Sequence, residues 1–409
     1  MERTADPDKL GFDPERLGRI DRHFARYVDD GRLAGWQIVV TRGGEVVHSS
    51  THGQADREAG RPVTDDQIWR IFSMTKPVTS VAAMMLWEEG LLELTDPVSK
   101  WIPSFADVRV FDKGSLTKYY TVPASEPVRV WHLLTHTSGL TYPFLQVSTV
   151  DGIYRNTLGW TLGMPRDLDL ATACDQLAAL PLLFQPGSAW GYSMSVDVLG
   201  RLVEVISGRT LEEFVAERIL QPLGMHDTAW SVGEDWADRL AALYAANPAG
   251  GPAVRYDALG DLIRVRPAGF EGGGGLVSTA ADYHRFTQML LRGGELDGVR
   301  LLGTRTLDWM TQNHLPGGKD LGELSVGGFA ETVFDGVGFG LGFAVVEDPR
   351  PSKAYSSPGE FFWGGLASTA FWVDPAEEVT AMLFTQLVPS SAHPLRPQLR
   401  QLVYSSLVD

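Results

Sequence analysis

Residues 71–76 read IFSMTK, and Pro77 and the apolar run VTSVAAMML at residues 78–86 follow them. Ser73 and Lys76 are three residues apart where a helix is predicted to begin, so their side chains share one helix face about a turn apart. Lys76 can take the proton of Ser73 if burial or nearby positive charge keeps its amine neutral. Proline is tolerated in a first helical turn, whose N–H groups also favour negative charge developing at Ser73. The stretch therefore predicts a nucleophilic serine with a lysine base.

The same spacing occurs again at Ser115 and Lys118 and provides an internal control. About one such match is expected by chance in a chain of this length, and a capping serine beside a solvated lysine is the simple alternative. Residues 119–123 after the second pair are predicted to be extended chain or loop, whereas the first pair heads an apolar helix. Only Ser73 and Lys76 have the predicted context of a catalytic pair.

The composition predicts a globular protein with two lobes. The chain has 409 residues, which exceeds the size at which a single hydrophobic core stops growing, and it is 44% hydrophobic and 21% charged. Its 35 basic and 51 acidic residues give a net charge of −16, which argues against nucleic acid or an anionic membrane as a main partner. The single cysteine, Cys174, excludes an intrachain disulfide and is expected to be a small buried apolar residue.

The N-terminal sequence contains no export signal. Residues 1–7 lack the apolar region of a secretory signal peptide, and no apolar run approaches the length of a membrane span. The sequence as given predicts a cytoplasmic protein with no membrane partner, with a processed precursor as the alternative. Whether the chain forms a homo-oligomer stays open.

Hydrophobic periodicity predicts an α/β (α+β) fold whose sheet is built from both ends of the chain. The predicted helices are residues 14–30, 73–90, 130–138, 167–180, 196–206, 211–219 and 395–407, and the predicted strands are residues 37–42, 45–49, 339–346, 360–373 and 379–387. We expect an antiparallel sheet flanked by helices, in an α/β lobe of residues 1–90 plus 270–409. A mainly helical lobe of residues 91–269 is inserted, and the active site is expected in the cleft between the lobes.

Two further stretches are candidates for the same site. Residues 184–195 read FQPGSAWGYSMS and place Tyr192 in a turn before a helix, where its phenol could exchange protons with a lysine. A buried tyrosine bonded to backbone is the alternative. Residues 361–369 read FFWGGLAST, and paired glycines in a predicted strand indicate close approach of another group, with a bulge or a packing contact as the alternative. An exposed N–H on that strand could join the N–H of Ser73 in binding an oxyanion.

His132 and His136 lie one helical turn apart and could form part of a metal site. No carboxylate or third ligand accompanies them in the neighbouring sequence, so packing or capping is the favoured interpretation and no metal is predicted. The glycines at residues 272–275 are not followed by Gly-Lys-Ser/Thr, so they do not predict a phosphate-binding loop.

In this order, the stretches around Ser73, Tyr192 and the paired glycines resemble the serine β-lactamase and penicillin-recognising superfamily. The most similar branch is the class C β-lactamase-like esterases, called family VIII carboxylesterases. The resemblance spans roughly residues 12 to 405 and includes LLTHTSGL at residues 133–140, GGGLVST at residues 273–279 and FWVDP at residues 371–375. It implies a β-lactamase/transpeptidase-like fold and a serine hydrolase that needs no cofactor.

The resemblance also implies a role for each matched position. Ser73 would be the nucleophile that becomes acylated, with Lys76 as base or proton relay and Tyr192 as the partner that exchanges protons in acylation and deacylation. The backbone N–H groups of Ser73 and Leu366 would form the oxyanion hole. The residues implied to contact substrate are Trp363, Gly364 and Gly365, which occupy the place of the family's Lys-Thr-Gly strand motif, together with Ser193 and Met194.

Two departures from the family pattern favour uncharged esters. The tyrosine stretch of β-lactamases is usually Tyr-x-Asn, and its third place here is Met194, whose thioether bonds a β-lactam side-chain amide poorly. Trp363 replaces the strand-motif lysine, so an apolar wall stands where a cation would attract the β-lactam carboxylate. The resemblance therefore implies a carboxylesterase acting on small, short-acyl esters. β-Lactamase, D-amino-acid peptidase or acyltransferase activity through the same acyl-enzyme is the alternative.

Two interpretations of other classes compete with this one. Residues 229–233, AWSVG, approximate the nucleophile elbow of an α/β-hydrolase with Ser231 as nucleophile, but a loop is predicted where the elbow requires a strand. A non-catalytic binding protein on the same scaffold is the other, and the retention of Ser73, Lys76 and Tyr192 together argues against it.

Overall fold

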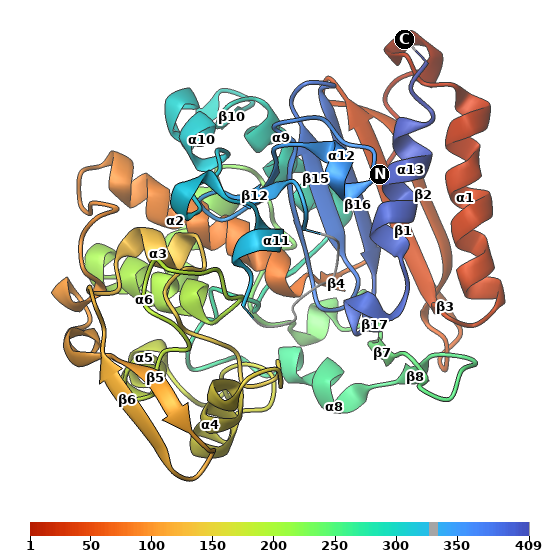
Figure 1. Ribbon diagram of the computed structural model, residues 1–409. Helices are drawn as coiled ribbons and strands as arrows, with labels where there is room; N and C mark the ends of the chain where they lie inside the picture. Colours follow the sequence, from red (N-terminus) through yellow and green to blue (C-terminus); the bar gives the residue numbers. More distant parts are fainter. Residues whose placement is uncertain (327–333, 409) are drawn as a thin grey trace.

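The protein is built around a large antiparallel sheet with helices on both faces (Figure 1). The computed structural model describes residues 1–326 and 334–408. In this part of the chain the main sheet has eight strands in the order β12-β13-β14-β15-β16-β1-β2-β3. These strands are β1 (Gly35–Arg42), β2 (Glu45–Asp56), β3 (Arg61–Pro62), β12 (Val337–Phe339), β13 (Ala344–Val346), β14 (Phe361–Gly364), β15 (Ala370–Asp374) and β16 (Val379–Thr385).

Strand β1 joins the two ends of the chain. It pairs with β2 on one side and with β16 on the other, with Val40 opposite Ala381 in the second pair. Gly43 and Gly44 make the turn between β1 and β2 with φ values of 58° and 90°, a backbone conformation that glycine adopts without steric cost. The predicted hairpin and the sheet built from both chain ends are therefore confirmed.

Helices α1 (Pro14–Asp29) and α13 (Leu395–Tyr404) cover one face of this sheet (Figure 1). Asp13 caps α1 by accepting a hydrogen bond from the N–H of Arg16, and Pro14 fits the first helical position. One hydrophobic core contains the apolar side of α1, apolar residues of α13 and residues of the central strands. The buried residues of α1 are spaced three and four apart, and their burial holds the helix against the sheet.

The opposite face carries α2 (Thr75–Glu88) and α9 (Ala280–Leu291). Every residue of α2 from Thr75 to Leu86 is buried, which is typical of a helix enclosed on all sides. Helix α6 (Ser195–Ser207) packs against α2, and it contacts α3 (Val130–Leu134), α5 (Leu170–Ala178) and α7 (Leu211–Val215) in turn. The core that contains α2 therefore continues from the sheet into the helical part of the chain.

The remaining elements are short. The helices are α4 (Thr149–Leu158), α8 (Asp257–Gly260), α10 (Thr304–Met310), α11 (Leu321–Leu324) and α12 (Pro349–Ser352). The strands are β4 (Trp69–Arg70), β5 (Arg109–Gly114), β6 (Tyr119–Pro123), β7 (Tyr244–Ala245), β8 (Val254–Arg255), β9 (Val277–Ser278), β10 (Glu295–Leu296), β11 (Val299–Arg300) and β17 (Leu387–Val388). No helix in the described residues combines the length and apolarity needed to cross a bilayer.

The expected division into lobes stays a prediction, and one segment departs from it. Strands β7 and β8 lie within residues 91–269, but β7 pairs with β17 near the C-terminus. Ala242 also donates its N–H to Ala55 O at 2.7 Å, which ties this segment to the end of β2. This stretch thus packs with the sheet rather than with the helices of the inserted lobe.

Several predicted elements were wrong in their extent; among them, the helix predicted for residues 130–138 ends at Leu134, and the α-helix predicted for residues 211–219 ends at Val215. Residues 339–346 form the turn and flanking ends of the β12–β13 hairpin, because Gly342 has a φ of 105° and turns the chain. Residues 360–373 form two strands, β14 and β15, because the chain reverses in a tight turn at residues 365–369. The helix predicted from residue 167 begins at Leu170, because Asp169 caps it by accepting the N–H of Thr172.

Ile38 tests the dependence of the fold on β1. Its side chain is 0% exposed, and Ile38→Ala should lower the free energy of unfolding by about 2–5 kcal/mol, because it removes buried methyl groups and leaves a cavity. The control Val254→Ala removes methyl groups that are 55% exposed and should change it by less than about 0.5 kcal/mol. Urea-denaturation midpoints of both variants against wild type provide the measurement, and equal midpoints would contradict this role of β1.

Candidate active site

Ser73 lies in a 3-10 turn, Phe72–Met74, that leads directly into α2. The hydroxyl of Tyr283 on α9 donates to Met74 O at 2.9 Å and holds this turn against the core. Phe72 has a φ of 43°, which is costly for an aromatic residue, so the surrounding packing maintains it. The helix was predicted to begin at Ser73, and α2 begins two residues later, at Thr75, directly after the 3-10 turn that contains Ser73.

Lys76 and Tyr192 both reach the oxygen of Ser73. The Lys76 ammonium donates to Ser73 Oγ at 3.1 Å, and the Tyr192 hydroxyl donates to the same atom at 2.6 Å. Lys76 Nζ also donates to Gly273 O at 2.6 Å. Both distances at Ser73 are within the range required for proton transfer. The structure thus brings Tyr192, which belongs to a separate stretch of sequence, to the pair formed by Ser73 and Lys76.

Aromatic packing fixes the ring of Tyr192. Its ring centroid lies 5.0 Å from that of His136, 5.3 Å from Tyr142, 5.5 Å from Trp363 and 6.2 Å from Trp190. The side chain is only 3% exposed, so few rotamers are available to it. The packing therefore aims the phenol at Ser73 without requiring substrate.

The two histidines stabilise local structure. His132 Nδ1 accepts the N–H of Arg129 at 3.1 Å, and His136 Nδ1 lies 3.1 Å from Ser193 Oγ. Burial lowers the pKa of His132 to about 4, and burial together with the charge of Lys76 holds the pKa of His136 well below its usual range. Both imidazoles are therefore neutral near pH 7, and in residues 1–326 and 334–408 no cluster of three metal-ligating side chains is present.

A cavity of about 150 Å³ opens beside Ser73. Ser73, Leu366, Tyr142 and Gly273 line it, and the carboxyl group of Glu271 adds a polar wall. Leu366 and Ser73 therefore face one space, as an oxyanion hole from their N–H groups requires. That role stays a prediction, because it concerns a reaction intermediate.

The turn after β14 positions Leu366. The N–H of Gly365 donates to Thr369 O at 2.9 Å, and Arg396 of α13 donates to Gly365 O at 2.9 Å and to Thr369 O at 3.0 Å. A Cβ atom on Gly365 would collide with Ile71 O, so only glycine allows the turn to lie against the segment that carries Ser73. The close approach inferred from the paired glycines is therefore present.

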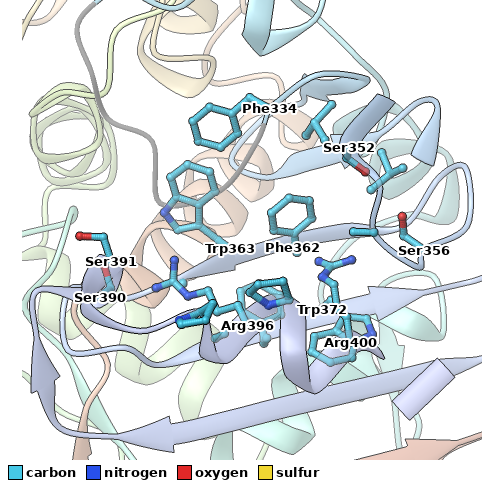
Figure 2. A pocket seen from close by; sticks show the side chains of 18 of the residues that line it. Phe334, Ser352, Ser356, Phe362, Trp363, Trp372, Ser390, Ser391, Arg396 and Arg400 are labelled. Carbon is cyan, nitrogen blue, oxygen red and sulfur yellow. The ribbon is translucent and has the colours of Figure 1, made fainter. Parts of the chain in front are cut away.

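Trp363 stands between Tyr192 and a larger cavity. Its ring lies 5.5 Å from Tyr192 and 5.3 Å from Phe339, and it is 6% exposed. Trp363 and Gly364 also line a cavity of about 380 Å³, into which Arg396 of α13 projects (Figure 2). The two predicted contact residues thus belong to the wall of this larger cavity.

Ser193 and Met194 do not lie on either cavity wall. Both side chains are at most 1% exposed, because the chain turns into α6 directly after Tyr192 and carries them inward. Ser193 Oγ lies 2.8 Å from Ser195 Oγ and 3.1 Å from His136 Nδ1. Their proposed contact with substrate therefore has no support from the shape of the site.

Two buried carboxyl groups near Lys76 were missed by sequence reasoning. Asp197 accepts the N–H of Gly273 at 2.9 Å, and Glu271 accepts the N–H of Met164 at 2.7 Å. Burial raises the pKa of Asp197, which the charge of Lys76 partly offsets; burial and the charge of Asp197 raise the pKa of Glu271. An acidic residue inside the apolar stretch VDVLG was the available signal for Asp197.

The competing nucleophiles lack the required surroundings. Ser115 and Lys118 lie at the exposed turn of the β5–β6 hairpin, where the Lys118 N–H donates to Ser115 Oγ at 3.3 Å. Ser231 occupies a bend, and the 3-10 helix Glu234–Trp236 follows it, so the strand-turn-helix of a nucleophile elbow is not formed there. Ser73 is thus the serine with both partners in place.

Comparisons with known proteins agree with this fold. A family model described as Beta-lactamase matches residues 20–405. Esterase EstB of Burkholderia gladioli is 32% identical over 421 residues, which cover 98% of this chain and 99% of that protein. The structure of EstCE1, described as a hydrolase with promiscuous acyltransferase activity, has a TM-score of 0.78 at 28% identity and covers 95% of this chain and 99% of its own.

A further structure supports the fold alone. Simvastatin synthase LovD from Aspergillus terreus has a TM-score of 0.79 at 23% identity, covering 95% of this chain and 98% of its own. The expected β-lactamase/transpeptidase-like fold is confirmed by these superpositions. With a family model that spans nearly the whole chain, the protein belongs to the beta-lactamase family.

Proposed function

We propose that this protein is a serine hydrolase that cleaves small, short-acyl carboxylic esters through an acyl-enzyme on Ser73. The observation that carries the proposal is the double contact at Ser73 Oγ, with Lys76 at 3.1 Å and Tyr192 at 2.6 Å. Membership of the beta-lactamase family and the similarity to Esterase EstB support an ester as the substrate class.

The reaction follows from this geometry in two halves. With the Lys76–Tyr192 pair one proton short of full protonation, Ser73 Oγ attacks the ester carbonyl while its proton passes to that pair, and the negative charge on the carbonyl oxygen is stabilised by the N–H groups of Ser73 and Leu366. The C–O bond to the alcohol breaks, and the pair returns the proton to that alcohol. Water then attacks the acyl-enzyme, gives its proton to the same pair and releases the acid, with the proton returned to Ser73.

The walls of the site favour small, uncharged substrates. A cavity of about 150 Å³ holds only a few heavy atoms, which suits a short acyl group beside Ser73. Trp363 provides an apolar surface where the family's strand-motif lysine would attract an anion. Trp363 itself therefore offers no cation to an anionic lactam, which favours uncharged substrates at this position.

Acyl transfer is the second candidate activity. An acceptor alcohol that enters beside Ser73 would compete with water for the acyl-enzyme. The description of EstCE1 as a hydrolase with acyltransferase activity is consistent with such competition in a related protein. The same acyl-enzyme would then form an ester in place of an acid.

Covalent labelling tests the nucleophile. A phosphonate ester probe, or brief exposure to a p-nitrophenyl ester, should add one label to the peptide that contains Ser73, because the amine of Lys76 and the phenol of Tyr192 both contact its oxygen. Intact-protein mass and peptide mapping provide the measurement. Ser73→Ala should remain unlabelled, and the matched variant Ser231→Ala should label as wild type does. A label on Ser231 would refute the proposed mechanism.

Removal of either proton-transfer partner should lower ester turnover. Lys76→Ala and Tyr192→Phe should each reduce kcat/KM for p-nitrophenyl acetate by at least about a hundredfold, the usual contribution of a general acid–base group. The control Lys118→Ala changes the exposed lysine of the second pair and should leave turnover unchanged. Ester turnover should also greatly exceed turnover of a chromogenic cephalosporin. Fast lactam turnover would assign the protein to the β-lactamase alternative.

A further inference from the structure

Asp197 is a buried carboxyl group in the first turn of α6 that faces Lys76 across Gly273. Its side chain is 4% exposed and accepts a hydrogen bond from the N–H of Gly273. We propose that Asp197 is a positioning residue that fixes both the place and the charge of Lys76 during acylation of Ser73. This inference rests on the proposed esterase function.

The glycine loop transmits the position of Asp197 to Lys76. The carboxylate of Asp197 accepts the N–H of Gly273 at 2.9 Å, and the carbonyl oxygen of Gly273 accepts the ammonium of Lys76 at 2.6 Å. The backbone of Gly273 therefore links the two helices: its N–H is bonded to Asp197 of α6, and its C=O is bonded to Lys76 of α2. Lys76 Nζ, 3.1 Å from Ser73 Oγ, is located by this pair of bonds.

Only glycine permits this contact at residue 273. A Cβ atom there would lie 2.7 Å from Asp197 Oδ2 and 3.0 Å from the Tyr142 hydroxyl, both shorter than a carbon can tolerate without a shift of its neighbours. Gly273, within the cluster of glycines at residues 272–275, therefore lets a carboxylate and a carbonyl contact one backbone residue.

The charges around Lys76 give Asp197 its second effect. Lys76 faces Asp197 on α6, Glu271 on the glycine loop, His136 after α3, and the phenols of Tyr142 and Tyr192. Burial holds His136 neutral, and burial raises the pKa of the Tyr142 hydroxyl well above its usual range, so neither carries charge near pH 7.

Of the two carboxyl groups, Asp197 is the one that interacts more with Lys76. Asp197 also faces Tyr142, Glu271 and, on α5, the buried thiol of Cys174. The charge of Lys76 is the main influence that favours ionised Asp197, whereas for Glu271 repulsion by Asp197 outweighs that attraction. An ionised Asp197 stabilises the ammonium form of Lys76 and the neutral phenol of Tyr192, so it opposes loss of a proton from either group.

The pH dependence of acylation separates this role from a structural one. Asp197→Asn keeps an acceptor for the N–H of Gly273 but removes the negative charge, so the proton-transfer pair loses its proton more easily. The acid limb of kcat/KM for p-nitrophenyl acetate should move to lower pH by roughly one unit. Asp197→Ala also removes the acceptor and should lower kcat at least about tenfold with KM little changed.

Asp282 supplies a matched control. It is also a buried carboxyl group in the first turn of a helix, α9, is 6% exposed, and accepts the N–H of Asp227 at 2.7 Å. The charges of Asp227 and His226, rather than that of Lys76, are the leading charges that act on its pKa. Asp282→Asn should lower thermal stability and leave the acid limb in place. An acid limb that stays fixed in Asp197→Asn, or that moves equally in Asp282→Asn, overturns the inference.

Labelling of Ser73 in wild type keeps the two proposals distinct. Wild type labelled at Ser73 with a fixed acid limb in Asp197→Asn retains the esterase function and rejects the role of Asp197, whereas wild type without that label rejects both. If Asp197→Asn does not fold, Gly273→Ala decides. Its Cβ must separate Gly273 from Asp197, so the acylation rate should fall at least about tenfold while the retained charge keeps the acid limb unchanged. A wild-type acylation rate overturns the inference.

Discussion

The burial of one cation constrains the rest of the site. The Lys76 side chain is 1% exposed, and removing an ammonium from water costs several kcal/mol unless bonds and opposite charge offset it. Here Ser73 Oγ and Gly273 O accept its hydrogen bonds, Asp197 supplies nearby negative charge, and the face of the Tyr192 ring lies 4.6 Å from Nζ. An ammonium with these partners has one favourable position. That position is beside the oxygen whose proton must move.

The partners of Lys76 come from distant parts of the chain, so the fold has to precede the site. Tyr192 is 119 residues from Ser73, and Gly273 is 197 residues from Lys76. Helix α2 lies in the core between the sheet and α6, which carries Tyr192 at its entrance and Asp197 in its first turn. Strand β14, close to the other end of the chain, brings Trp363 and the turn with Leu366 against the same segment. Because β1 pairs with β16, the N- and C-terminal segments of the chain lie side by side in the folded protein.

The sequence contained the local features and lacked those that depend on packing direction. Ser73 before an apolar helix, Tyr192 in a turn and paired glycines beside Leu366 were visible because each has a local pattern, and α1, β1 and β2 followed from periodicity. The break between β14 and β15 was missed because residues 361–373 are apolar on both sides of the turn. The resemblance implied a substrate contact for Met194, and the sequence did not reveal that its side chain points inward where α6 begins. Asp197 was missed for the same reason, since burial of a carboxyl group is a tertiary property.

Trp363 and Asp197 change the electrostatics of the site in the same direction. The family pattern places a second lysine at the position of Trp363, and two ammonium groups in one cleft each disfavour the protonated form of the other. Trp363 removes that repulsion and packs on Tyr192 at 5.5 Å, while the buried Asp197 adds attraction. Both changes favour a protonated Lys76 in the resting enzyme. A protonated Lys76 in turn stabilises negative charge on the phenol of Tyr192, only 2.6 Å from Ser73 Oγ. Within the proposed mechanism we therefore expect Tyr192 to take the proton of Ser73, with Lys76 as the neighbouring cation that stabilises the transfer.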